Sequence, residues 1–171
     1  MFPIQLGLKA SSAPEQVASR LKYHPDVFEF FTSEVDYTAD SLEKLEEAIQ
    51  KVKSSSVKTI VLHHPMKYQG KRLELVAHPK NNAELVNFID FSTQKLLDLA
   101  KKYDCKVLVH GSYELEEAEL LEPFASIEDA RQYLFSRMDH FCHIGKDYIM
   151  FENGISKLYS CLLYTSDAAD D

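Results

Sequence analysis

The chain alternates short apolar runs with longer amphipathic segments, and this alternation restricts its fold more than any other feature. The apolar runs are predicted to be strands. Most of them are continuously hydrophobic rather than alternating, which is typical of parallel strands covered on both faces. They are Pro3–Lys9, Val27–Phe31, Thr59–His64, Lys106–Gly111 and Tyr148–Glu152. Because strand and helix follow each other throughout, the sequence predicts a parallel α/β sheet with right-handed crossovers.

The amphipathic segments between the strands carry helix start signals. Ser12-Ala13-Pro14-Glu15 resembles a capping box with a proline in the first turn, and it predicts a helix that ends at about Tyr23. Three further helices are predicted: one that opens at Asp40, one from Asn82 to about Tyr103, and one that opens at Ser126.

A doubly wound sheet and a closed barrel are both compatible with this pattern. No glycine-rich phosphate-binding fingerprint follows the first strand at Leu6–Ser11, so a dinucleotide-binding fold has no support. A (β/α)8 barrel needs eight units and about 250 residues, whereas the chain has 171. The predicted fold class is therefore α/β, an incomplete (β/α)8 TIM barrel with about five of the eight βα units.

The end of the chain differs in character from the rest. Residues 161–171 resemble the in-frame translation of a transposase sequencing adapter over ten consecutive positions, and a natural acidic tail is the alternative. We expect a partial barrel domain at 1–160 and an adapter-derived tail at 161–171. A barrel cut after its fifth strand exposes unpaired edges, so self-association as a homo-oligomer is also expected.

Charge and cysteine content limit the partners and the compartment. The chain has 19 Lys and Arg against 27 Asp and Glu, a net charge of −8, which disfavours nucleic acid as a partner. Its three cysteines form no metal-binding or disulfide pattern, so a reducing compartment is expected. With no apolar run long enough for a membrane span and no signal sequence at the start, a cytoplasmic protein without membrane contact is predicted.

Three consecutive predicted strands end in side chains that can bind metal. They end at His63-His64, at His110 and at Glu152, followed by Asn153. Imidazole and carboxylate are ligands for Zn, Mn or Co, and the carboxyl ends of parallel barrel strands share one mouth. A single histidine at a strand end is usually only hydrogen-bonded, but three such endings favour a metal or polar substrate site.

Strand alternation adds a prediction about orientation. If Glu152 points into the barrel, Met150 does too, while Ile149 and Phe151 face the helices. Only one of the adjacent histidines can point inward. His63 is favoured, and His64 is the second choice because the proline that follows it restricts it to extended geometry. His24 and His78 both precede proline and are expected in loops. His140 and His143, three residues apart on or just after a helix, could form a surface metal pair, but solvated helix residues are favoured.

The three strand endings, in this order and spacing, resemble the third, fourth and fifth strands of the xylose-isomerase-like TIM-barrel superfamily. That superfamily contains sugar and sugar-phosphate isomerases and epimerases and the apurinic endonuclease family. The resemblance covers roughly residues 3–160. It implies that Glu152 is a metal ligand and catalytic residue, that His110 and His63 are metal ligands or line the substrate site, and that His64 and Asn153 bind substrate.

The resemblance implies a divalent-metal-dependent sugar or sugar-phosphate isomerase or epimerase, with Mn, Zn, Co or Mg as the cofactor. In such an enzyme a carboxylate moves a proton next to a carbonyl and the metal stabilises an enediolate. The ligands that the superfamily carries on strands six to eight have no counterpart here, so this chain alone is expected to be inactive.

Two alternatives remain open at this point. A metal-dependent phosphodiesterase acting on damaged DNA would display basic residues around the mouth. The loop after the third strand supplies Lys67, Lys71, Arg72 and Lys80, but the stretch Glu114–Glu122 after the fourth strand would repel phosphate. The other alternative is a non-catalytic barrel that binds a ligand or partner without chemistry.

Overall fold

The computed structural model describes residues 4–111 and 121–152. Within these ranges, five parallel strands form one sheet in the order β1-β2-β3-β6-β7, which is also their order along the chain. They are β1 (Gly7–Ala10), β2 (Val27–Phe31), β3 (Thr59–His63), β6 (Lys106–His110) and β7 (Ile149–Glu152). Because the described order never reverses, it contains no switch point of the doubly wound kind.

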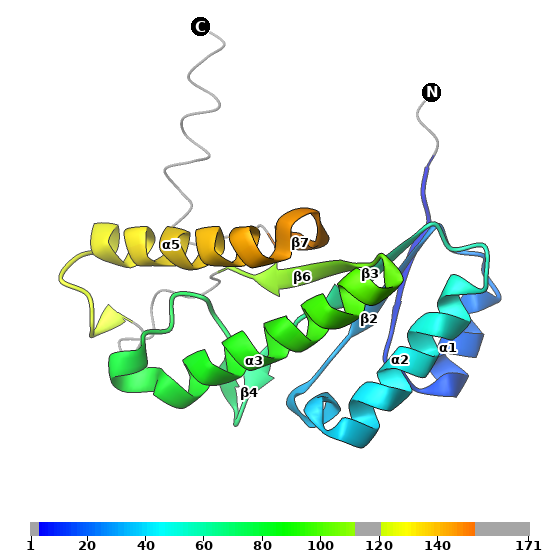
Figure 1. The fold of residues 1–171 in the computed structure, drawn as a ribbon, viewed down its shortest axis with the longest axis horizontal. Coiled ribbons are helices and arrows are strands. Elements are labelled where there is room, and N and C mark those ends of the chain that lie inside the picture. Colours follow the sequence, from blue (N-terminus) through cyan, green and yellow to red (C-terminus); the bar gives the residue numbers. More distant parts are fainter. Residues whose placement is uncertain (1–3, 112–120, 153–171) are drawn as a thin grey trace, which may run out of the picture.

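The helices follow one another along the sheet in chain order (Figure 1). They are α1 (Pro14–Leu21), α2 (Ala39–Lys53), α3 (Pro79–Tyr103) and α5 (Ile127–Gly145), with short 3-10 helices η1 (Glu34–Tyr37) and η2 (Lys146–Tyr148). Contacts join α1 to β1, α2 to β3, α3 to β6 and α5 to β7, and α2 also packs on α1 and α3. A repeated βα unit with sequential parallel strands is the plan of a (β/α)8 barrel. The described residues form a five-stranded sector of such a barrel, as predicted.

The strand register divides the side chains into two faces. Phe28 lies beside Ile60 and Phe30 beside Leu62, and the same row continues from Leu62 to Val107. All of them are buried in the core between the sheet and the helices. Alternate residues of the same strands point to the opposite, inner face. We call this inner face the lumen face; it includes Lys9, Glu29, Phe31, Val61, His63, Leu108, His110, Met150 and Glu152.

The helix starts follow the sequence signals in part. The hydroxyl of Ser126 accepts a hydrogen bond from the amide of Asp129 at 3.1 Å, which confirms the predicted cap of α5. The predicted capping box of α1 is wrong, because the cap residue is Ala13 and no side chain caps the helix. Pro14 at the first helical position explains the difference. A residue before proline is held in extended geometry, and Ala13 has φ −58° and ψ 125°.

The third helix starts earlier than predicted. It begins at Pro79, and the ring of its cap residue His78 accepts a hydrogen bond from the amide of Lys80 at 3.2 Å. Asn82, the predicted cap, instead marks a kink with φ −137° and ψ 45°. The first strand is shorter than predicted, since it begins at Gly7 rather than at residue 3. None of the described helices is long and apolar enough to cross a membrane.

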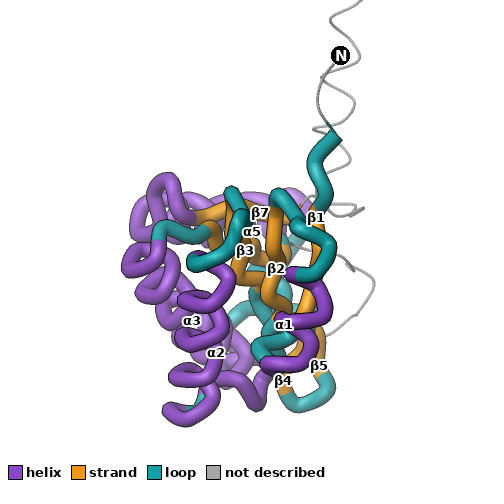
Figure 2. The backbone as a smooth tube through the Cα atoms, turned by 90° about the vertical axis from the view of Figure 1, so that its right-hand side faces the viewer, coloured by secondary structure: helices purple, strands orange, loops and turns teal. Residues whose placement is uncertain are grey.

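The segment predicted as a loop after the third strand contains a small hairpin. Its strands are β4 (Lys67–Tyr68) and β5 (Lys71–Arg72), joined by Gln69 and Gly70 with φ values of 50° and 79°. Positive φ at both turn residues is typical of a type I′ turn, which suits a tight antiparallel ribbon. Figure 2 shows the hairpin at the lower end of the molecule, away from the N-terminus. It therefore belongs to the carboxyl edge of the sheet, where β3 ends.

Candidate metal centre

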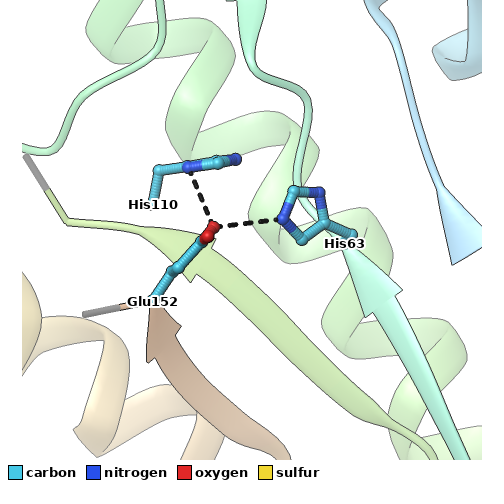
Figure 3. Close-up of side chains that lie close together, drawn as sticks. All are labelled: His63, His110 and Glu152. Carbon is cyan, nitrogen blue, oxygen red and sulfur yellow. Dashed lines mark hydrogen bonds and ion pairs between the residues drawn. The ribbon is translucent and has the colours of Figure 1, made fainter. Parts of the chain in front are cut away.

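Three side chains predicted as metal ligands meet at the carboxyl edge of the sheet (Figure 3). The Oε2 atom of Glu152 lies 3.3 Å from Nε2 of His63 and 3.3 Å from Nδ1 of His110. One ligand atom from each of the three residues lies within 4.8 Å of the others. Within residues 4–111 and 121–152, this is the one group of three metal-ligating side chains so arranged.

The strand register explains why these residues meet. Each is the last residue of its strand, on β3, β6 and β7, and His110 lies directly beside Glu152. His63 pairs with Leu108, two residues before His110, so both imidazoles share the lumen face. The side chains of Ile149 and Phe151 pack against the core on the other face, as the alternation predicted.

The triad formed by His63, His110 and Glu152 combines two buried rings with one accessible carboxylate. The side chains of His63 and His110 are 5% and 3% exposed, whereas that of Glu152 is 37% exposed. The two rings meet edge to face, with centroids 4.7 Å apart and planes at 82°. Solvent and a ligand therefore reach the triad from the side of the carboxylate.

Burial sets the protonation state of His110. Removal from water lowers the pKa of its imidazole to about 4, and the neighbouring His63 adds to this effect, while Glu152 opposes it. The ring is therefore neutral at physiological pH. A neutral imidazole keeps the lone pair that binds a metal ion.

His64, predicted to bind substrate, lies on the other side of the strand. It is 1% exposed, and its Nε2 atom is 2.8 Å from the hydroxyl of Ser92 on α3. The Ser92 hydroxyl donates to the carbonyl of Phe88 at 2.6 Å, so it accepts from Nε2 of His64. Burial lowers the pKa of His64 to about 3, and the neighbouring imidazoles of His110 and His63 act in the same direction. This placement favours a structural role, joining the end of β3 to α3.

The other residues named from the sequence either take no part in the triad or lie outside the described ranges. His140 and His143 are exposed on α5 and take no part in the triad. Asn153, the second residue predicted to bind substrate, lies outside the described residues, as do 161–171 and most of the acidic stretch from residue 114. Roles for Asn153 and for the tail stay predictions.

A pocket of about 510 Å³ adjoins the triad. His63 is part of its wall, and the other lining residues come from the ends of β1 and β2 and from the start of the hairpin. They are Lys9, Phe31, Thr32, Ser33, Glu34, Met66 and Lys67. Its size lies within the range of about 300–1,000 Å³ found for small-molecule sites. Alternation alone could have placed Lys9 and Phe31 on the lumen face, but not the hairpin.

Comparisons with known proteins add a fold relationship. No protein-family model matches the chain, and no curated protein matches it. Among solved structures it is similar to the crystal structure of a D-tagatose 3-epimerase-like protein, with a TM-score of 0.59 and 19% sequence identity. The chain shares that fold. The alignment covers 88% of this chain and 53% of the other, so the chain spans about half the length of that structure.

Proposed function

We propose that this protein is a divalent-metal-dependent isomerase or epimerase acting on a sugar or sugar phosphate. The observation that carries the proposal is the triad of His63, His110 and Glu152 at the carboxyl ends of three neighbouring barrel strands. Active sites of (β/α)8 barrels lie at this edge. The fold shared with a D-tagatose 3-epimerase-like protein supports the choice of sugar chemistry within the barrel class.

The triad fits a divalent cation by its donor set and by its spacing. Two imidazole nitrogens and one carboxylate form a mixed nitrogen and oxygen set, suited to Zn, Mn or Co, with Mg as the weaker match. Ligand atoms around a tetrahedral ion at about 2.1 Å lie about 3.4 Å apart. The two contacts of Glu152 at 3.3 Å agree with that separation. Three protein ligands also leave positions open for substrate oxygens, as catalytic sites require.

The roles of the residues follow from their burial. When bound, a divalent ion supplies Lewis-acid polarisation of neighbouring substrate oxygens. His63 and His110, fixed in the strand ends and shielded from water, would hold that ion. Glu152 is the accessible member, so we propose that its carboxylate both binds the ion and contacts the substrate hydroxyl or proton next to the carbonyl.

Calorimetric titration of the 171-residue chain with Mn²⁺ tests the site. We expect one bound ion per chain and a loss of affinity of at least about tenfold in His63→Ala, His110→Ala and Glu152→Gln. His140→Ala, which removes an exposed histidine from α5, is the matched control and should bind like the parent. Absence of binding by the parent, or equal loss in the control, would refute the metal centre.

The chemistry has its own measurement. Because this chain spans about half of the epimerase-like structure and is expected to be inactive alone, the assay uses a chain that completes the barrel. A ketose incubated with that Mn²⁺-loaded protein in D₂O should exchange the hydrogen on the carbon next to its carbonyl, as detected by proton NMR. The exchange should disappear in Glu152→Gln. Metal binding without exchange for a panel of ketoses and ketose phosphates would favour the non-catalytic alternative.

One observation favours a second candidate, a metal-dependent phosphodiesterase. The hairpin beside the triad contains Lys67, Lys71 and Arg72 and gives the carboxyl edge a basic element. Such an enzyme should bind DNA with an abasic site, and its affinity should fall steeply with salt. The net charge of −8 argues against this candidate. Fluorescence anisotropy at two salt concentrations decides between them.

A further inference from the structure

The pocket beside His63 differs from the triad in its chemistry. Its apolar wall consists of Phe31 and Met66, whose side chains are 39% and 56% exposed. Its charged groups are the ammonium groups of Lys9 and Lys67 and the carboxylate of Glu34. A ligand that enters from the triad therefore meets a hydrophobic surface and then cationic donors.

The hydroxyl groups in the wall are already engaged. The hydroxyl of Thr32 donates to the carbonyl of His63 at 2.8 Å, and that of Ser33 donates to the carboxylate of Asp36 at 2.8 Å. Neither hydroxyl proton is directed at the pocket. The strong donors left for a ligand are the two lysines.

The two lysines differ in availability. Lys9 is paired with Glu29, with the Lys9 Nζ atom 2.8 Å from the carboxylate. Glu34 is also engaged, because its Oε2 atom accepts a hydrogen bond from the amide of Gln69 at 2.5 Å. Within the described part of the chain, Lys67 forms no ion pair. Lys67 is thus the cation best able to bind a ligand.

The hairpin holds Lys67 in place. Lys67 lies directly opposite Arg72, so two positive charges share one face of the ribbon. The ring of Tyr68 stacks on Phe88 of α3 at 4.2 Å and 15°, and the turn is tied to η1 through Glu34. The backbone at Lys67 is therefore held beside the pocket, and its exposed side chain can reach a ligand there.

We propose that this pocket binds the anionic end of the substrate, with Lys67 as its main contact and the apolar wall against the carbon chain. The inference rests on the proposed function, because it assumes that the reacting carbons lie at the triad. A phosphate ester and a sugar carboxylate share the required negative charge. A phosphate suits the site better, since it carries more negative charge than a carboxylate and three oxygens that can accept from the Lys67 ammonium group.

Binding of matched ligands to the 171-residue chain tests this inference. Ribulose 5-phosphate, ribulose, ribonate and inorganic phosphate are titrated calorimetrically at low salt, with and without Mn²⁺. We expect the phosphate ester to bind at least about tenfold more tightly than the neutral sugar, the scale of one charge-assisted hydrogen bond. Lys67→Gln should reduce that difference to about twofold or less, whereas Lys22→Gln, which removes an exposed lysine after α1, should leave it unchanged.

The outcomes separate this inference from the proposed function. Equal affinity for ribulose and its phosphate, or a preference that survives in Lys67→Gln, would overturn the anionic subsite even if Mn²⁺ binds. A preference for the phosphate in a chain that binds no Mn²⁺ would support the subsite and remove the proposed metal chemistry. Tighter binding of ribonate than of the ester would support the subsite and assign it to a carboxylate. An unchanged circular dichroism spectrum and urea midpoint of Lys67→Gln show that the variant is folded.

Discussion

The two faces of the sheet use the same strands for different tasks. Toward the helices, alternate residues such as Phe28, Phe30 and Leu62 are fully buried and form a close-packed core. On the lumen face, the positions between them carry charges, imidazoles and partly exposed apolar groups such as Phe31 and Met150. The last residues of β3, β6 and β7 are the polar His63, His110 and Glu152.

This difference shows how a barrel sector separates stability from chemistry. The core face fixes the strand register by excluding water, and any slip by one residue would exchange the two faces. The register set by the core then places His63, His110 and Glu152 close together, so the triad itself does not have to stabilise the fold. Changes on the core face should therefore alter unfolding, and changes on the lumen face should alter binding.

The largest effect should come from a pair of adjacent phenylalanines. Phe30→Ala removes a fully buried ring from the core face and should lower the free energy of unfolding by about 3–5 kcal/mol. Phe31→Ala removes a ring that is 39% exposed on the lumen face and should cost about 1 kcal/mol or less. Urea denaturation followed by circular dichroism measures both. Similar losses would show that the two faces do not differ as described.

Metal should stabilise the protein through the lumen face alone. Free Mn²⁺ at one hundred times its dissociation constant should raise the free energy of unfolding by about 2.7 kcal/mol. Glu152→Gln should remove this gain while leaving the metal-free stability close to that of the parent. Thermal unfolding with Mn²⁺ and with EDTA provides the measurement. A gain that persists in Glu152→Gln would place the ion elsewhere.

Acid should destabilise the fold through its buried histidines. The pKa of His64 is about 3 and that of His110 about 4, both below the ordinary value of 6.5. Below pH 6.5 the unfolded chain binds protons that the folded protein does not, so stability is complete above that pH and falls as the pH decreases toward 4. Each such imidazole contributes up to about 1.4 kcal/mol for each pH unit.

A variant isolates one part of this slope. His64→Asn should flatten the dependence of unfolding on pH between 6.5 and 4.5, whereas His140→Asn, at an exposed position, should not. Chemical denaturation at several pH values records the slopes. Identical slopes for the parent and His64→Asn would mean that His64 is protonated in the folded protein.

Much of this arrangement could be predicted from strand alternation. The spacing of the apolar runs gives the parallel sheet, and one position per strand decides which of His63 and His64 faces the lumen. The helix-capping signal failed at the start of α1, where Pro14 makes Ala13 the cap residue in place of Ser12. Local capping signals compete with each other, and the sequence does not indicate which one prevails.

Most of the pocket wall could not be predicted because it comes from separate segments. Lys9 and Phe31 lie on strands whose ends carry no metal-binding residue. The position of Lys67 is set by a hairpin within a segment that the sequence predicted as a loop. The turn signal was present in Gln69-Gly70, since glycine favours positive φ. What the sequence lacks is the stacking of Tyr68 on Phe88, a tertiary contact that fixes the hairpin beside the triad.

The smallest effect on stability should come from replacing either of two glycines, Gly70 in the hairpin turn and Gly7 at the start of β1. Gly70→Ala places a side chain at φ 79° with no neighbour within 4 Å, so its cost is conformational, about 1 kcal/mol. Gly7→Ala adds a methyl group at an ordinary contact distance of 3.8 Å from Val27 and should be close to neutral. Because the turn positions Lys67, Gly70→Ala should also weaken binding of ribulose 5-phosphate, and Gly7→Ala should not. Equal phosphate affinity in the two variants would mean that the turn geometry is not what presents Lys67 to the pocket.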